Sequence, residues 1–185
     1  MRTKLKNIAS IQTGLFARTV SEGEIVFLKA KHFNENGLIV NYIRPELIRS
    51  SSVELHLLKP GDVLFAAKGT RNFAAVYDIP DQSCVASTSF FVIRLKENSI
   101  LPEYLVWYLN HPGTLQLLKA QAIGTSIVSI SKPVLEELEI SIPDMKTQQT
   151  ILIITKLRIK EKQLKQQVEK LRETQIQHLI IKAIK

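Results

Sequence analysis

Apolar and polar positions follow two different patterns along the chain, and the change falls at Pro143. Before it, short apolar runs alternate with turn-forming residues, as is typical of strands. The runs expected to form strands are 25–28, 38–40, 63–66, 73–77 and 89–93. The turn signal at 34–37 lies between the first two runs and predicts that they pair with each other.

Two helices are expected later in this first part. Pro102 opens one of them, since proline suits the first turn of a helix, and the apolar spacing continues to Leu109. The other is expected from Thr114 to Gln121, with its end near Gly124. Strands and helices together predict an α+β domain over residues 1–143, with a twisted sheet and flanking helices.

The last 42 residues show no helix-breaking signal. All seven Gly and all seven Pro lie at or before Pro143, and no aromatic residue follows it. The sequence therefore predicts one long helix over residues 144–185. At 1.5 Å per residue, its length would be on the order of 60 Å.

This helix carries a heptad seam that needs a partner helix. The residues expected at the seam, and so at a dimer interface, are Ile154, Leu157, Leu164, Val168 and Leu171. Glu161 and Gln175 interrupt the series, and a shifted apolar stripe follows from Ile176. The pattern fits a coiled coil of about three heptads, because a single helix cannot bury its own stripe.

Charge and cysteine content indicate what kind of partner the protein binds and in which compartment it works. The net charge is +8, and residues 144–185 hold 10 Lys/Arg against 4 Asp/Glu, so most of the excess lies on the predicted helix. A basic surface favours an anionic partner, although a solvated helix face would look the same. One cysteine, Cys84, and no apolar stretch of roughly 18 residues indicate a cytoplasmic protein without a membrane segment.

None of the common catalytic patterns is present. Lys68-Gly69-Thr70 lacks the glycine spacing of a phosphate-binding loop, and no Gly-x-Ser-x-Gly turn occurs. The four histidines and Cys84 are scattered, so no metal site is expected. We expect no catalytic residues and no cofactor, which favours a binding or scaffolding protein.

Several segments together resemble the specificity subunits of type I restriction-modification systems. Residues 4–14 are similar to that family's domain start, and 59–70 to its central strand and loop. The other matching segments are 102–110, 124–143, and the Gln148 and Ile151 positions at the start of the helix. Met145 and Lys146 depart from the family pattern at the helix entry.

The resemblance implies a DNA-recognition role. In that family, two target-recognition domains and two spacer helices form one subunit, and the helices pack antiparallel between two DNA half-sites. Modification subunits dock on this assembly, and restriction subunits can join. Residues 1–143 and 144–185 would be one target-recognition domain and one spacer helix, a half-length form. A homodimer through the seam would restore the second half and would read a palindromic target in double-stranded DNA.

Polar and cationic residues in the loops of 1–143 are the expected DNA contacts. Arg, Asn and Gln read base edges, while Lys, Arg, Ser and Thr bind phosphates. The candidates are Arg18, Thr19, Lys29, Lys31, His32, Lys68, Gly69, Thr70, Arg71, Asn72, Thr125 and Ser126. Ordinary solvated turns would also explain these residues.

Three other interpretations remain open. The chain could be a coiled-coil adaptor without a DNA function, a silent specificity cassette, or an unrelated nuclease with an unusual site. Salt-dependent DNA binding distinguishes the first from a specificity subunit.

Overall fold

The computed structural model describes residues 1–34, 37–39, 42–69, 71–79, 82–122 and 129–184. It divides the chain into two units, Met1–Gln148 and Gln149–Lys185. No helix among the described residues is both long and apolar enough to cross a membrane.

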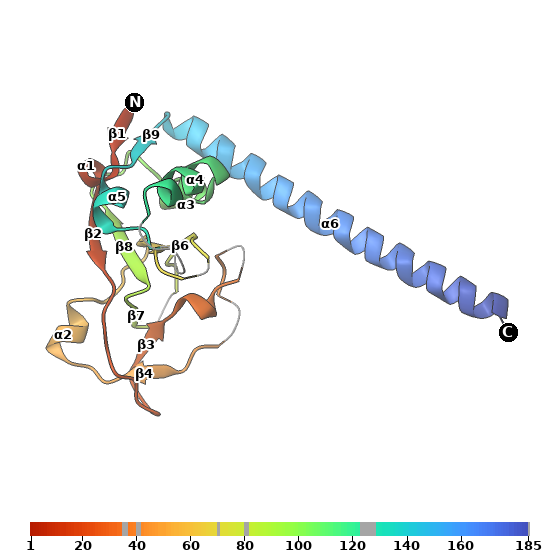
Figure 1. The fold of residues 1–185 in the computed structure, drawn as a ribbon, viewed down its shortest axis with the longest axis horizontal. Coiled ribbons are helices and arrows are strands. Elements are labelled where there is room, and N and C mark those ends of the chain that lie inside the picture. Colours follow the sequence, from red (N-terminus) through yellow and green to blue (C-terminus); the bar gives the residue numbers. More distant parts are fainter. Residues whose placement is uncertain (35–36, 40–41, 70, 80–81, 123–128, 185) are drawn as a thin grey trace. The chain divides into compact units, whose positions relative to one another are not determined.

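The first unit is a mixed α+β fold, as the sequence predicts (Figure 1). Its strands are β1 (Arg2–Lys4), β2 (Ala9–Thr13), β3 (Ile25–Leu28), β4 (Pro45–Leu47), β5 (Val63–Ala66), β6 (Ala74–Val76), β7 (Cys84–Ala86), β8 (Phe90–Leu95) and β9 (Glu139–Ser141). Its helices are α1 (Leu5–Ile8), the 3-10 turn η1 (Ala30–His32), α2 (Ser51–Glu54), α3 (Pro102–Asn110), α4 (Pro112–Ala120) and α5 (Lys132–Glu136). The helix α6 (Met145–Ile184) begins in this unit and forms the second one.

Three sheets organise the first unit. β2, β8, β5 and β6 form an antiparallel four-stranded sheet in that order. In a second sheet β3 lies in the centre, antiparallel to β4 and parallel to β7. β1 and β9 form a third, two-stranded sheet that joins the beginning and the end of the unit.

β3 is buried on both faces. Its side chains alternate, so Val26 and Leu28 join a core cluster with residues of β5 and β8, including Phe90. Ile25 and Phe27 point the other way, into a second cluster with Leu47, Val53 and Val85. A continuous apolar strand is typical of this two-sided burial.

The predicted pairing of 25–28 with 38–40 is wrong for the described residues. β3 pairs with β4 and β7, and Ile39 instead forms an isolated bridge with Phe33. Leu38 and Ile39 are exposed, and Val40 lies outside the described residues. The turn signal therefore marks a small local loop, whereas burial on both faces selects the long-range neighbours of β3.

The other predicted elements are confirmed with small changes of boundary. β5, β6 and β8 match the runs 63–66, 73–77 and 89–93, and α3 begins at Pro102. α4 begins at Pro112, two residues before the predicted start, because His111 Nδ1 accepts a hydrogen bond from Gly113 N (3.2 Å) and caps it. The predicted end near Gly124 lies outside the described residues.

Gln148 ties the first turn of α6 to the first unit. Its side chain is fully buried, and its Oε1 accepts from Leu101 N (2.9 Å). Its Nε2 donates to the carbonyl oxygens of Ser99 (2.8 Å) and Pro143 (3.0 Å). The unit thus extends beyond Pro143 because this amide satisfies three backbone groups that would otherwise lack partners.

We predict that Gln148→Leu destabilises the first unit by on the order of 3 kcal/mol, because buried groups lose their partners. Urea unfolding followed by the fluorescence of Trp107, the single tryptophan, measures this change. Gln149→Leu, at the exposed neighbouring position, is the matched control and should shift stability by less than about 0.5 kcal/mol. Equal effects of the two substitutions would contradict the structural role of Gln148.

Candidate nucleic-acid interface

The loop after β2 is held at both ends and presents Arg18 and Thr19 to solvent. Gly14 N donates to Phe90 O (3.0 Å), and Val20 N donates to Glu46 O (2.9 Å) at β4. A Cβ on Gly14 would lie 2.1 Å from Ser87 O, so only glycine fits there. Arg18 and Thr19 are both exposed between these anchors. The backbone thus fixes where these two candidates lie.

The second group of candidates surrounds η1. Lys29 Nζ lies 2.5 Å from Glu46 Oε2, so this cation is already paired inside the protein. The hydrogen bond from Lys29 is the main reason why the pKa of Glu46 lies below its usual value. Lys31 is exposed, and among the described residues no ion pair involves it.

His32 belongs to the same turn, and its surroundings favour the uncharged form of its ring. Its Nδ1 accepts a hydrogen bond from Lys29 N (3.2 Å), which leaves the ring proton on Nε2. Burial, together with the charges of Lys31 and Lys29, lowers the pKa of His32. A neutral imidazole of this kind can donate a hydrogen bond to a phosphate or a base without adding charge.

In the loop between β5 and β6, some polar side chains make hydrogen bonds within the protein and others are exposed to solvent. Asn72 is buried and its Nδ2 donates to Ala66 O (3.0 Å), so its amide holds the loop in place. Arg71 donates to the carbonyl oxygens of Phe33 (2.9 Å) and Asn34 (3.1 Å) and lies 5.1 Å from the ring of Phe73. These contacts join the β5–β6 loop to the segment after η1.

The other residues of this loop are open to solvent or outside the described part of the chain. Lys68 is exposed, and Gly69 has φ +126°, where a Cβ would have no atom within 4 Å. Thr70, Thr125 and Ser126 lie outside the described residues. Ser129, which follows the latter two, forms a bridge with Lys68.

The fold brings three loops together around the sheet of β3 and β4. The loop of Arg18 is hydrogen-bonded to β4, Lys29 is paired with Glu46 of β4, and Arg71 reaches the segment after η1. Within the described ranges, no ion pair involves Arg18, Lys31 or Lys68. The charges of these three side chains are therefore not neutralised by an acidic side chain within these ranges.

The sequence patterns did not reveal two further residues in this region. Tyr42 and Arg44 precede β4 and line a hollow of about 440 Å³ with Lys31 and His32. Arg44 is exposed, and no ion pair involves it in the part of the chain that the structure describes. An aromatic residue two positions before an arginine, directly ahead of Pro45, is the signal that could have identified them.

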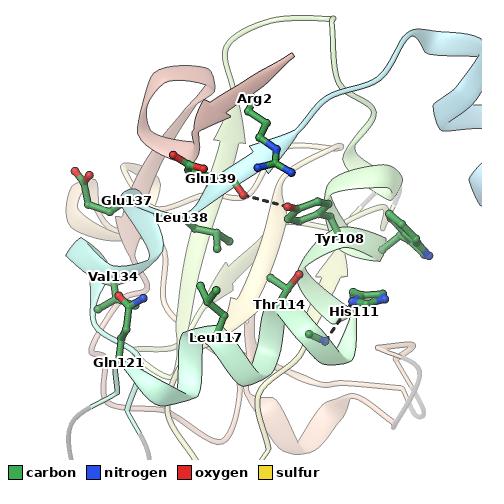
Figure 2. A pocket seen from close by; sticks show the side chains of 12 residues that line it. Arg2, Tyr108, His111, Thr114, Leu117, Gln121, Val134, Glu137, Leu138 and Glu139 are labelled. Atoms are coloured by element: carbon green, nitrogen blue, oxygen red, sulfur yellow. Dashed lines mark hydrogen bonds between the residues drawn. The ribbon is translucent and has the colours of Figure 1, made fainter.

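Figure 2 shows a second concave surface of the first unit. This groove of about 680 Å³ is lined by residues of β1, α3, α4, α5 and β9, among them Arg2, Trp107, Leu117 and Val134, and by Leu138 between α5 and β9. Its Tyr108 Oη donates to Glu139 O (3.1 Å), and its His111 caps α4. Both polar side chains are therefore used by the fold, and the described residues that line the groove include no nucleophile paired with a base.

Glu137 at the rim of the groove is also occupied. It forms ion pairs with Lys4 Nζ (2.6 Å) and with Lys6 Nζ. The hydrogen bonds from these two lysines lower the pKa of Glu137 to about 2. This cluster links α5 to the first strand and helix of the unit.

No arrangement for metal binding or covalent catalysis is found in the described ranges. No group of three or more His, Cys, Asp or Glu side chains there could hold a metal ion. Cys84 is buried, and burial raises the pKa of its thiol, which makes it a poor nucleophile.

Comparison with known proteins shows the family of this chain. The family model described as type I restriction modification DNA specificity domain matches residues 4–170, which is most of the sequence. The chain belongs to this family, and the predicted resemblance to type I specificity subunits is confirmed. A search among curated proteins found no match.

Solved structures of specificity subunits share the fold. The chain is similar to the HsdS subunit from Thermoanaerobacter tengcongensis, with 17% identity and a TM-score of 0.62 over 87% of this chain and 37% of that one. It is also similar to the type I S subunit from M. genitalium, with 16% identity and a TM-score of 0.58 over 85% of this chain and 38% of that one.

A third similar chain comes from a structure on complex assembly and conformational transition of the type I R-M system. It shows 18% identity and a TM-score of 0.61 over 96% of this chain and 41% of that one. The present chain thus spans about two fifths of the length of these three proteins.

We predict that Asn72→Ala lowers the free energy of unfolding by about 1–3 kcal/mol, because Ala66 O loses its buried donor. Lys68→Ala, in the same loop, should leave stability within about 0.5 kcal/mol, since its side chain is exposed. Urea denaturation of the two variants tests this division. An unchanged stability of Asn72→Ala would show that its amide is free to contact DNA.

Proposed function

We propose that this chain reads one half of a bipartite DNA target for a type I restriction-modification complex. Residues 1–143 act as the target-recognition domain, and residues 144–185 as the spacer helix. The gathering of unpaired cations on the loops around β4, in a member of the specificity family, is the observation that supports this proposal most directly. The chain would work in the cytoplasm, in contact with double-stranded DNA.

Reading of the target is separate from methyl transfer in this proposal. Arg18, Lys31, Lys68 and Arg44 place the protein on phosphates, and neighbouring hydroxyl and imidazole groups such as Thr19 and His32 contact the DNA between them. The modification subunits that dock on the chain carry the catalytic step, and restriction subunits can join the assembly.

The exposed seam of α6 supports pairing with a second helix. Ile154, Leu157, Leu164, Val168 and Leu171 are all exposed on the helix. An antiparallel arrangement with a second copy places Ile154 opposite Leu171, and Leu157 opposite Val168. We propose this homodimer, in which two identical readers related by a two-fold axis recognise a palindromic target with a fixed gap.

Co-expression with a candidate modification subunit, followed by mapping of methylated adenines, tests the proposed function. We predict a gapped, palindromic motif, because two copies of one reader face opposite half-sites. A stable complex that neither methylates DNA nor binds it in a salt-dependent way would instead favour a coiled-coil adaptor. A folded chain that forms no complex at all would favour a silent cassette.

Leu157→Lys tests the pairing of the helices. We predict that it converts the dimer into a monomer in sedimentation at micromolar concentration, because it places a charge opposite the apolar Val168 of the second copy. Gln166→Lys adds the same charge at a heptad position that faces away from the seam, and it should leave the dimer intact. A wild-type monomer under these conditions would rule out self-pairing, whatever the methylation result.

A further inference from the structure

Two short segments beside β4 share the same order of an aromatic residue, an apolar residue and an arginine. The first is Phe16-Ala17-Arg18, and the second is Tyr42-Ile43-Arg44. The first leads to Val20, whose N–H donates to Glu46 O of β4, and the second runs directly into β4 at Pro45. Segments far apart in the sequence thus present the same three residue types at one strand.

In each segment the first and third side chains are exposed to solvent, and the middle side chain packs against the protein. Ala17 packs against the core cluster of Ile25 and Phe27, and Ile43 packs against the cluster of Val26 and Leu28. The aromatic side chains are almost fully exposed, 82% for Phe16 and 81% for Tyr42. This alternation is that of an extended chain, so each ring and its arginine lie on the same side.

Each pair also borders a hollow of the surface. Phe16 and Arg18 line one of about 300 Å³ together with Ile48 and Ser52. Tyr42 and Arg44 line the hollow of about 440 Å³ that contains Lys31 and His32. An exposed ring, a free cation and a hydroxyl or imidazole group therefore meet at both places.

Apolar side chains are exposed together at the first hollow, where Phe16 lies with Val20 (37%) and Ile48 (61%), and grouped apolar surface of this kind marks a site that a partner covers. In duplex DNA, deoxyribose and the thymine methyl group offer apolar surface to a ring, and the adjacent phosphate attracts an arginine. Residues two apart in an extended chain are separated by about 6.6 Å, close to two base steps of about 3.4 Å along one strand. The spacing therefore fits one DNA strand that contacts both members of a pair.

We propose that Phe16–Arg18 and Tyr42–Arg44 are two matched DNA clamps, in which the ring packs on sugars and base edges and the guanidinium binds the neighbouring phosphate. This inference rests on the proposed function, and it assigns Phe16 and Tyr42 as contact residues in addition to Arg18 and Arg44. The rings contribute affinity without charge, whereas the arginines contribute affinity that depends on salt.

The two contributions are separated by measuring DNA affinity at several salt concentrations. The sample is the complex of this chain with its modification subunits, and the probe is a duplex that carries the motif found by methylation mapping. Phe16→Ala and Tyr42→Ala should each weaken binding about 10- to 100-fold, through the loss of a buried aromatic side chain, and leave the salt slope unchanged. Arg18→Ala and Arg44→Ala should each reduce the slope by about 0.9 per chain.

Matched control variants test whether the loss of any exposed apolar or cationic side chain would change DNA affinity. Leu55→Ala removes an equally exposed apolar side chain (81%) that lines neither hollow, and Lys119→Ala removes an exposed cation of α4. Both should leave affinity and slope as in the wild type. Tyr42→Phe keeps the ring and should retain the wild-type affinity, which separates ring packing from a hydrogen bond of the hydroxyl.

Three results would overturn the inference. If the wild-type complex shows no salt-dependent binding, the proposed function fails and the clamps fail with it. If the wild type binds and the ring variants behave like Leu55→Ala, the clamps alone are wrong. If the ring variants lose the modification subunits while the assembled complex keeps its DNA affinity, the rings contact protein rather than DNA.

Discussion

The burial of β3 on both faces is the constraint on which the proposed DNA-binding surface depends. Because Val26 and Leu28 fill one core and Ile25 and Phe27 the other, a slip of the strand by one residue would put each pair into the core that is packed around the other. Its neighbours β4 and β7 are fixed with it. The loops of Arg18, Lys31 and Arg44 lie against β3 or β4, so their positions follow from this double burial.

The same constraint explains which parts of the fold could be predicted from the sequence. β5, β8 and α3 have strong local signals, an apolar run or a proline at the first turn, and all three were predicted. The partner of β3 was not, because a turn signal reports local geometry and parallel pairing with β7 joins residues far apart in the chain. The long helix was predicted because the absence of Gly, Pro and aromatic residues is itself a continuous local signal.

Local composition was a weaker guide to the candidate site. It identified the β5–β6 loop by residue type. In the structure, however, Asn72 is buried and donates to Ala66 O, and Arg71 donates to Phe33 O in the segment after η1. Burial decides which polar side chain is available, and burial depends on the whole fold. Tyr42 and Arg44 were missed for the same reason, since nothing in the sequence states that their segment lies beside β4.

Charge pairing explains how a nearly balanced domain can offer a cationic surface. Residues 1–143 carry only a small excess of positive charge, yet several of their acidic groups are already used by the fold. Glu137 is paired with two lysines, Asp62 with Arg94 (2.6 Å), and Glu46 with Lys29. Such pairs hold elements together and remove both charges from the field seen by a partner at a distance. Arg18 and Arg44 beside β4 form no ion pair among the described residues, so the distribution of ion pairs, rather than the net charge, defines the surface proposed to bind DNA.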